Sequence, residues 1–200
     1  MNILVDAPPE FVTIGTTEYP LNTDFRACLK IIMAFEDNEL TPQEKQIILL
    51  GNLYSVVPND LNAALDHANW FLNGGKEKPT DDEGEISNPR VYSFAKDGNF
   101  IYAAFRQTHG IDLSTAQLHW WTFLALFMDL GQDTTFCQLT ALRKRLKTGK
   151  ASKEEQAAAR EMGEMIEIPE IDDRTLGEKE AENDFLRKVR ELEEKKRHAV

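Results

Sequence analysis

The residues that come closest to a chemical site are His119, directly before Trp120-Trp121, and Asp112, a few residues upstream. A histidine and a carboxylate can together orient a metal ion or move a proton, as a metal-dependent hydrolase or nuclease requires. A lone histidine without further ligands, however, rarely binds a metal. We therefore favour a histidine that is hydrogen-bonded within the core, and a metal-dependent hydrolase is the third-ranked alternative.

Other catalytic patterns are missing from the sequence. It has no GxSxG turn for a serine nucleophile, no glycine-rich phosphate loop, no GxGxxG after a strand and no HExxH helix. Cys28 and Cys137 stand alone without zinc-type spacing, which is typical of reduced thiols in a cytoplasm. We expect no catalytic residue, no bound metal and no cofactor, and we interpret His109, before Gly110, as a helix-end residue.

The paired indoles of Trp120 and Trp121 suggest two roles. Tryptophan is enriched in binding sites, so the pair could form a shelf for a ligand. Adjacent residues of a helix point about 100° apart, however, so the two rings cannot form one flat platform. Core packing against two different neighbouring helices is the better explanation.

The stretch Gly110–Leu130 predicts the central buried helix, because a start signal leads into an almost continuous apolar run. Ser114 and Gln117 have the spacing of a capping box, which places the start of the helix there. The run is shorter than the roughly 20 residues that cross a bilayer, so we expect a core helix and no membrane contact. Its predicted core residues are Leu118, Trp120, Trp121, Phe123, Leu124 and Phe127.

Composition limits the classes of partner. The chain of 200 residues carries a formal net charge of −11, which repels a phosphate backbone and argues against nucleic-acid binding. The one dense basic cluster is interpreted as cations at the negative end of a helix: Arg143, Lys144, Arg145 and Lys147. The N-terminus lacks the pattern of a signal peptide, so we expect a cytoplasmic protein.

A β-hairpin is predicted at the start of the chain, where Phe11–Gly15 alternates apolar and polar residues before Thr16–Leu21. An isolated two-stranded hairpin is marginal in water, so it must pack on helices or join the sheet of a partner. Its edge, with Phe11, Val12 and Ile14, is therefore a predicted assembly contact.

Helical spacing accounts for most of the remaining residues. A helix from Asn22 is capped by Thr23 or Asp24, and Thr41 with Glu44 forms a capping box for the next one. Further helices are predicted from Pro58 to residue 72, at residues 89–95, from Phe100, after the break at residues 97–99, to about residue 109, and at 136–146. The polar residues 76–88 are interpreted as an exposed acidic loop.

These elements predict a mainly α protein with one helical domain over residues 1–147, including the N-terminal hairpin. Residues 148–200 form a charged helical extension, because the large apolar residues become sparse there. Ser152 can cap an alanine-rich helix through Met162. Further along, a narrow apolar stripe consists of Phe185, Leu186, Val189 and Leu192. A partner could cover this stripe, although a solvated helix explains it equally well.

Several segments carry a resemblance to a known family. FIYAAFRQTHGIDL, then LHWW and GQDTTFCQL, lie within residues 97–143, and the chain opens with MNILVDAPPEFVTIGTTEYPLNTDFRACLKI. In these segments the sequence resembles the bacteriophage Gp15 family, whose members are encoded in the tail module of siphophages and prophages. The resemblance covers most of residues 1–147, and LHWW is its most specific part.

The resemblance implies a non-enzymatic tail assembly chaperone in the host bacterial cytoplasm. Such proteins bind the long, hydrophobic tape measure protein and keep it soluble while tail tube protein polymerises around it. Self-association into a homo-oligomer that coats the client is a further expectation. The second-ranked alternative is a structural minor tail or connector protein of the virion. Lys195-Lys196 also motivates the hypothesis of a longer product made by ribosomal frameshifting.

Overall fold

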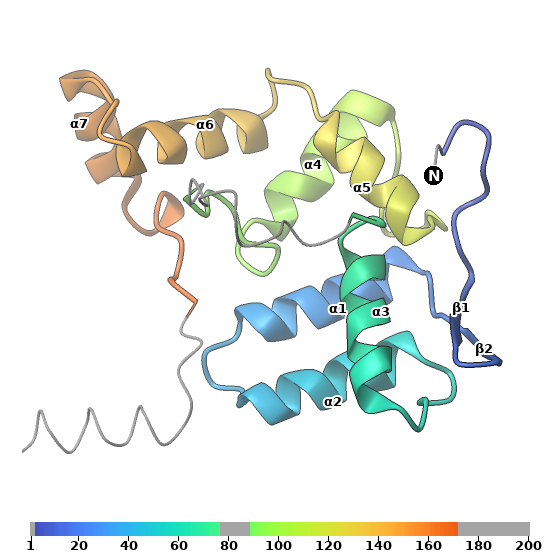
Figure 1. Cartoon of the computed structure of the whole chain (residues 1–200). Helices are drawn as coiled ribbons and strands as arrows, with labels where there is room; N and C mark the ends of the chain where they lie inside the picture. The colour runs from blue at the N-terminus through green and yellow to red at the C-terminus, as the bar shows by residue number, and fades with distance from the viewer. Residues whose placement is uncertain (1–2, 77–88, 172–200) are drawn as a thin grey trace, which may run out of the picture.

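The structure, a computed structural model, describes residues 3–76 and 89–171. It confirms the predicted fold class, because helices dominate and a small antiparallel hairpin lies near the N-terminus (Figure 1). The first half contains β1 (Phe11–Ile14), β2 (Thr17–Pro20), α1 (Phe25–Glu36), α2 (Pro42–Leu53) and α3 (Leu61–Leu72). The second half contains α4 (Gly98–His109), α5 (Trp120–Met128), α6 (Thr135–Lys147), α7 (Lys153–Met162) and the 3-10 turn Gly163–Met165.

The hairpin closes over Gly15-Thr16, and its strands pair from Phe11 opposite Pro20 to Ile14 opposite Thr17. Gly15 has φ of +63°, which glycine adopts without the steric cost that other residues incur. The prediction of a hairpin at this place is confirmed. Beyond it, the amide of Asn22 donates to the carbonyl of Leu53 at 2.7 Å, which attaches the exit of the hairpin to α2.

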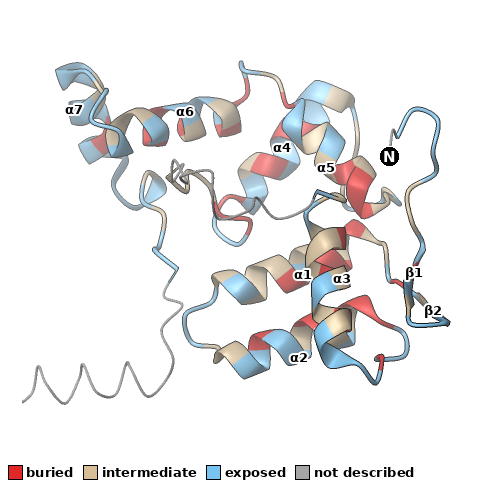
Figure 2. Cartoon of the chain, in the orientation of Figure 1, coloured by how far each residue is buried: buried red, intermediate tan, exposed pale blue. Residues whose placement is uncertain are grey.

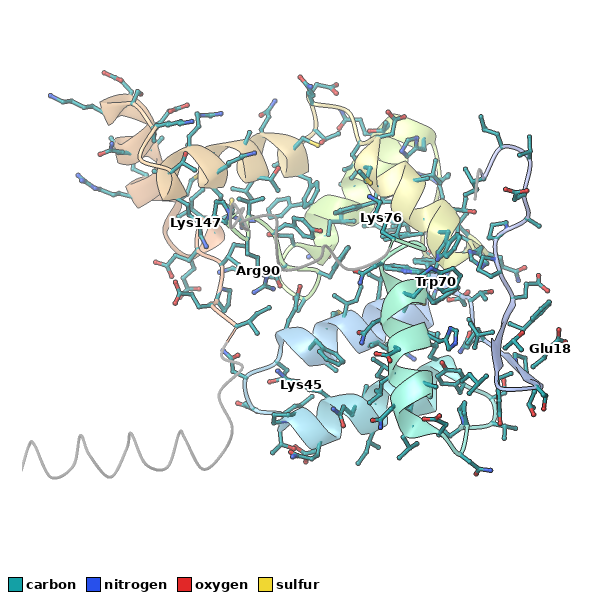
Figure 3. All side chains as sticks on the ribbon, viewed as in Figure 1. Glu18, Lys45, Trp70, Lys76, Arg90 and Lys147 are labelled. Carbon is teal, nitrogen blue, oxygen red and sulfur yellow. The ribbon has the colours of Figure 1, made fainter. Side chains whose placement is uncertain are left out.

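Local capping signals set the starts of α1 and α2 as predicted. Asp24 accepts from the amide of Arg26 at 2.8 Å, and Thr41 with Glu44 forms the reciprocal capping box. α3, however, begins at Leu61 and not at Pro58, because Asp60 is its N-cap. The C-terminus of α1 is held by α2 as well (Figure 3), since the buried Lys45 ammonium donates to the carbonyl of Phe35 at 3.1 Å.

The predicted start of the central helix at Ser114 is wrong. Asp112 accepts from both the amide and the hydroxyl of Ser114, at 2.9 and 2.6 Å, which closes a local turn. Ser114 therefore belongs to a turn that precedes the helix, and it does not cap the helix. α5 begins six residues later at Trp120, with His119 as its N-cap.

The short helix predicted at residues 89–95 is also absent from the described structure. This segment is attached to the C-terminal end of α1, because the Glu36 carboxylate accepts from the amides of Phe94 and Ala95 and from the hydroxyl of Ser93. Arg90 pairs with the same carboxylate at 2.8 Å. Contacts with a distant residue therefore replace the local hydrogen bonds of a helix turn.

Aromatic rings form the centre of the core, and Figure 2 shows buried residues on the helices that surround it. Phe123 stacks with both Phe25 and Phe105, each at a centroid distance of 5.0 Å, and with Trp120 at 5.5 Å. The predicted core residues are buried to different degrees. Trp120, Trp121 and Phe123 are buried, whereas Leu118, Leu124 and Phe127 are half-buried.

α5 is shorter and more open than predicted. It has nine residues, and Met128 near its end is 77% exposed. Among the described residues, no helix combines the length and apolar content that a bilayer crossing requires.

α6 carries an unexpected buried charge at Arg143, which the sequence analysis placed with the solvated cations of a helix end. Its guanidinium forms two hydrogen bonds to the Asp97 carboxylate, at 2.7 and 3.0 Å, and both side chains are at most 2% exposed. It also donates to the carbonyls of Val91, Met165 and Ile166. Arg143 therefore joins α4, the 89–97 segment and the residues after α7.

The remaining cations of the cluster fit the prediction better. Lys144, Arg145 and Lys147 lie in the last turn of α6, where positive charge complements the helix dipole. α7 then begins with the capping box of Ser152 and Glu155. The division into a domain ending at residue 147 and an extension stays a prediction.

Candidate functional site: two surface grooves

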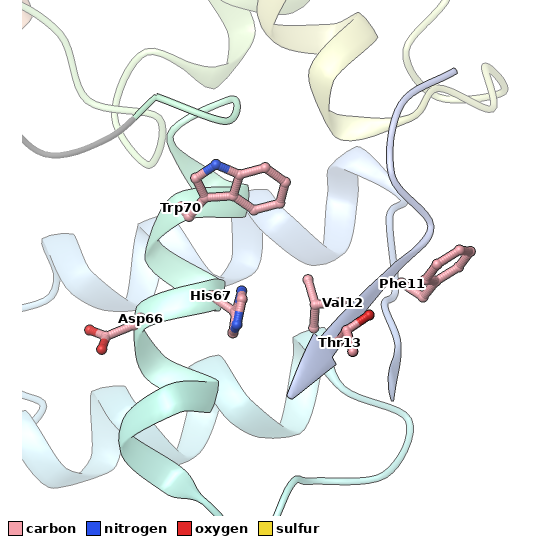
Figure 4. Close-up of a pocket in the computed structure, with 6 residues that line it drawn as sticks. All are labelled: Phe11, Val12, Thr13, Asp66, His67 and Trp70. Atoms are coloured by element: carbon pink, nitrogen blue, oxygen red, sulfur yellow. The ribbon is translucent and has the colours of Figure 1, made fainter. Parts of the chain in front are cut away.

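A groove of about 490 Å³ lies between β1 and α3 (Figure 4). Three consecutive residues of β1 and three residues of α3 line it: Phe11, Val12, Thr13, Asp66, His67 and Trp70. No residue of β2 is among them, so the groove follows the side of β1 that faces away from its partner strand.

The hydrogen-bonding pattern of the hairpin leaves that edge of β1 open. The amide of Leu21 donates to the carbonyl of Glu10 at 2.8 Å, which makes these two residues a hydrogen-bonded pair. Because such pairs alternate along antiparallel strands, Val12 is bonded to β2, whereas the amides and carbonyls of Phe11 and Thr13 point outward. No described residue bonds these outward groups. The edge can therefore accept another extended strand.

The three predicted contact residues of β1 differ in exposure. Phe11 is 53% exposed and projects from the hairpin, Ile14 is half-buried, and Val12 is only 5% exposed because its side chain faces α3. Val12 therefore belongs to the floor of the groove, and Phe11 offers the larger accessible surface. The other predicted contacts, Phe185, Leu186, Val189 and Leu192, lie outside the described residues.

The second groove, of about 720 Å³, lies between α6 and α7. Its apolar lining includes Leu139 and Leu142 from α6 together with Ala158 and Met162 from α7, and Met165 follows them. Met162 and Met165 are 41% and 46% exposed. The ion pair of Arg145 and Glu155, at 2.7 Å, borders the groove on both helices.

Sequence reasoning missed this second groove. The signal was the placement of Ala158, Met162 and Met165 on successive turns after a serine cap, but α7 is too polar overall to suggest an apolar surface. The ion pair of Arg145 with Glu155 joins the two helices, and Arg143 holds the residues after α7 through the carbonyls of Met165 and Ile166. Methionine side chains are flexible and polarizable, so a groove that contains them adapts to apolar partners of different shape.

His119 is fully used in folding. Its Nδ1 accepts from the amide of Trp121 at 3.0 Å, so its Nε2 carries the hydrogen and donates to the carbonyl of Pro9 at 3.1 Å. Asp112 has partners of its own in Tyr102, Ser114 and Arg106. In the two described ranges, no three or more histidine, cysteine or carboxylate side chains come together as metal ligands. The structure therefore does not bring the proposed hydrolase residues together.

The two indoles hydrogen-bond to the same helix, and their predicted packing against two different helices stays a prediction. Trp120 donates to the carbonyl of Leu72 at 2.9 Å, and Trp121 donates to the carbonyl of Phe71 at 2.8 Å. Both therefore bind the C-terminal end of α3, where the last carbonyls of a helix lack intrahelical partners. Trp121 also meets Trp70 edge to face at 5.4 Å. The rings are structural and do not form a ligand shelf.

Comparison with known proteins connects this architecture to phage biology. Residues 4–168 match the family model described as Bacteriophage Gp15 protein, which is more than half of the chain. The matched region includes the hairpin, both grooves and all seven α-helices of the described residues. Neither the curated proteins nor the solved structures gave a match.

Proposed function

The chain belongs to the Bacteriophage Gp15 protein family, and from this premise we propose that it is a tail assembly chaperone that binds the tape measure protein. Family membership indicates a phage structural or assembly protein. The chaperone role goes further and is non-enzymatic. It requires an adaptable apolar surface on a soluble, charged body that works in the host bacterial cytoplasm before the tail is complete.

The groove between α6 and α7 is the observation that carries this proposal. Both helices contribute residues to its lining, and its exposed Met162 and Met165 provide flexible apolar contacts. An apolar client segment in helical form can place one face in such a groove, as amphipathic helices do in other recognition systems. The rims carry charged side chains, including Arg145 and Glu155, which keep the surroundings hydrated.

Net charge supports the same role. At a formal charge of −11, several copies bound along one client repel each other and neighbouring complexes. That repulsion opposes aggregation of a hydrophobic client while its own apolar surface is covered. Tail tube protein is then the second partner, because it replaces the chaperone as the tube grows.

The test is co-expression with the tape measure protein of the same gene cluster, followed by size-exclusion chromatography. We expect the client to become soluble and to elute with the chaperone. The double variant Met162→Glu/Met165→Glu should abolish co-elution, because two carboxylates in the groove cannot be desolvated by an apolar segment. A matched control is Ile47→Glu on α2, whose side chain is 69% exposed and whose helix contributes no residue to the groove.

The outcomes of this test answer two separate questions. One is whether the chain acts as a chaperone, and the other is whether the groove between α6 and α7 binds the client. An insoluble client that never elutes with the unmodified chain argues against chaperone activity of this product. Co-elution that survives the double variant retains the function and excludes the α6 and α7 groove as the binding surface. Deletion of residues 172–200 then tests the predicted contacts at Phe185, Leu186, Val189 and Leu192.

A structural virion protein is the second candidate, because a permanently buried partner surface could also be apolar and exposed in the isolated chain. Mass spectrometry of purified virions separates the two candidates, since a chaperone is absent from the finished particle. The nucleotide sequence around Lys195-Lys196 tests the hypothesis of a longer frameshifted product. A slippery heptamer with an overlapping reading frame is expected, and without both the hypothesis fails.

A further inference from the structure

We propose that residues 165–170, here called the strap, form a releasable latch for α7. With the strap in place, α7 lies against α6 and the groove between the two helices exists. When the strap leaves its hydrogen-bond donors, α7 and the strap move away together and the groove is lost, while the rest of the fold is kept. The latch does not depend on the proposed chaperone function, although it decides when the groove is available to a client.

The donors that hold the strap contact its backbone. Arg143 of α6 donates to the carbonyls of Met165 and Ile166, at 2.6 and 3.0 Å. Arg90, which precedes α4, donates to the carbonyl of Pro169 at 2.8 Å (Figure 3). Because every peptide unit offers a carbonyl, these bonds hold the strap without requiring particular side chains.

The far end of the strap reaches the connection between α1 and α2, as Figure 1 shows. There the side-chain amide of Asn38 donates to the carbonyl of Glu170 at 2.8 Å, across 132 residues of sequence. The side chains of the strap contribute less burial, since only Ile166 and Ile168 are half-buried and the other four are exposed. The strap therefore links the connection between α1 and α2 to α7 through its main chain.

Both arginine donors are held in place by carboxylates that do not belong to the strap. Arg143 forms two hydrogen bonds to Asp97, and Arg90 pairs with Glu36 at 2.8 Å. Glu36 in turn accepts from a hydroxyl and two amides within residues 93–95. The donors therefore keep their positions when the strap leaves, which allows the strap to bind again.

α7 has little burial of its own. Ala159 is its one buried residue and Glu155 is half-buried, whereas the others are exposed. A helix of ten residues is marginal in water, since isolated helices shorter than about 12–15 residues rarely persist. The ion pair of Arg145 with Glu155 is partly exposed and adds little. The position of α7 therefore depends on the strap.

The surroundings of α7 also favour a local opening. Residues 148–150, which connect α6 to α7, are exposed, and Gly149 has open space around its Cα. α6, α7 and the strap surround a cavity of about 570 Å³, which Leu146, Ala159 and Ile166 help to line. Segments with few buried contacts open at a lower free energy than the core does. α7 and the strap can thus separate from α6 without unfolding the body.

The first test is hydrogen exchange, followed by mass spectrometry, on the full-length protein. We expect the amides of α7 to exchange through a local opening that is more frequent than the opening of α5. The double variant Asn38→Ala/Arg90→Lys removes one donor of the strap and weakens another. Lysine keeps a positive charge beside Glu36 but lacks the guanidinium fork that reaches two partners. This donor variant should speed the exchange of α7 at least about threefold and leave α5 unchanged.

Asn52→Ala is the matched control for the donor variant. The side-chain amide of Asn52 also donates to a backbone carbonyl at 2.8 Å, but that carbonyl belongs to Ile48 of the same helix, α2. Its loss removes a bond of equal length that does not involve the strap. The exchange of α7 should therefore stay at the rate of the unmodified protein.

A second test follows the buried position of α7 directly. Ala159→Cys in a Cys137→Ala background places a thiol there, while Cys28 stays protected by its burial. A thiol reagent should label the introduced thiol slowly, because the reagent must wait for α7 to open. Adding the donor variant should accelerate the labelling by about the same factor as the exchange of α7, and adding Asn52→Ala should leave the rate unchanged.

Two results would overturn the latch. The first is exchange of the α7 amides only as rarely as that of the slowest α5 amides, because α7 then opens only when the whole protein unfolds. The second is an unchanged rate in the donor variant, either of α7 exchange or of thiol labelling. Neither measurement involves a client, so a failed latch leaves the proposed chaperone function to be decided by co-elution.

Discussion

Trp120 and Trp121, adjacent on α5, donate their indole N–H groups to successive carbonyls at the end of α3. The bonds to Leu72 and Phe71 measure 2.9 and 2.8 Å. The two indole side chains thus hydrogen-bond to the C-terminal end of α3, directly before the loop that begins at Asn73.

The first prediction concerns Gly75, which has φ of +78° and lies against Trp121. A methyl group at Gly75 would be 2.6 Å from Cη2 of Trp121, so Gly75→Ala suffers both backbone strain and overlap. Gly110 has a similar φ of +69° but open space around it. Gly110→Ala should cost about 1–2 kcal/mol of unfolding free energy, and Gly75→Ala should cost about 1–3 kcal/mol more.

Urea unfolding of both glycine variants measures these costs. Adding Trp121→Phe to Gly75→Ala should recover part of the loss, because phenylalanine lacks the ring atoms that overlap. The double-mutant cycle should therefore give a favourable coupling of at least about 0.5 kcal/mol. Equal costs for Gly75→Ala and Gly110→Ala would contradict the close approach of Trp121.

The second prediction concerns the buried ion pair. Arg143→Met should lower the free energy of unfolding by about 3–5 kcal/mol, because it leaves the Asp97 carboxylate buried without its partner. It also removes the donor to the carbonyls of Met165 and Ile166, so residues after α7 should become more accessible to protease. Urea unfolding and limited proteolysis measure the two effects.

Arg145 is the control for that prediction, since it lies two residues away on the same helix and pairs with Glu155 at the surface. Both of its paired side chains are about a third or more exposed. Arg145→Met should therefore cost only about 0–1 kcal/mol. Similar losses for the two arginine variants would mean that Asp97 does not depend on Arg143.

The third prediction tests His119 as an N-cap. His119→Ala removes the acceptor for the Trp121 amide and should cost about 0.5–2 kcal/mol of unfolding free energy. His119→Asn keeps a side-chain acceptor at the position and should restore much of that loss. Thermal unfolding of the two variants makes the comparison, and no difference between them would exclude the capping role.

The fourth prediction concerns the buried Cys28. Burial, with a contribution from the nearby Asp24 charge, raises the pKa of its thiol to about 12, so the reactive thiolate is absent near neutral pH. A thiol reagent at pH 8 should modify the half-buried Cys137 first, and Cys28 only after unfolding. Mass spectrometry identifies the modified residue, and rapid labelling of Cys28 in the folded protein would contradict its burial.

The raised pKa of the Cys28 thiol also predicts how the free energy of unfolding changes at alkaline pH. Tyr54 is similar, because burial raises the pKa of its phenol to about 12 while its hydroxyl donates to the carbonyl of Ala64. Between the ordinary pKa values, near 9 and 10, and about 12, the unfolded chain loses protons that the folded chain keeps. Stability should therefore be complete below pH 9 and fall as the pH rises toward 12. Cys28→Ala and Tyr54→Phe should each reduce that decline in alkaline urea titrations.

Sequence reasoning succeeded where a structure depends on neighbours in the chain. The caps at Asp24, Thr41 and Ser152 involve side chains that bond within three residues, so their spacing alone predicts them. The hairpin likewise depends on alternation around Gly15. The family resemblance rests on residue identities and is equally independent of the tertiary structure.

It failed where a distant residue offers a better partner than a near one. Glu36 holds residues 93–95 out of a helix, although it lies 57 to 59 residues away from them in the sequence. Arg143 has the spacing of a solvated helix-end cation, but Asp97 lies within reach only after α4 and α6 have packed. In each case the competing partner is close in space and has no recognisable spacing in the sequence.

The sequence by itself determined the family, the helical class, the N-terminal hairpin and most helix starts, because these depend on residue types and short-range hydrogen bonds. Only the tertiary structure decided which surfaces remain open. The groove between β1 and α3 and the one between α6 and α7 exist because packing brings separate segments together and leaves Trp70 or Met162 between them. Exposure belongs to the packed molecule, and no local pattern encodes it.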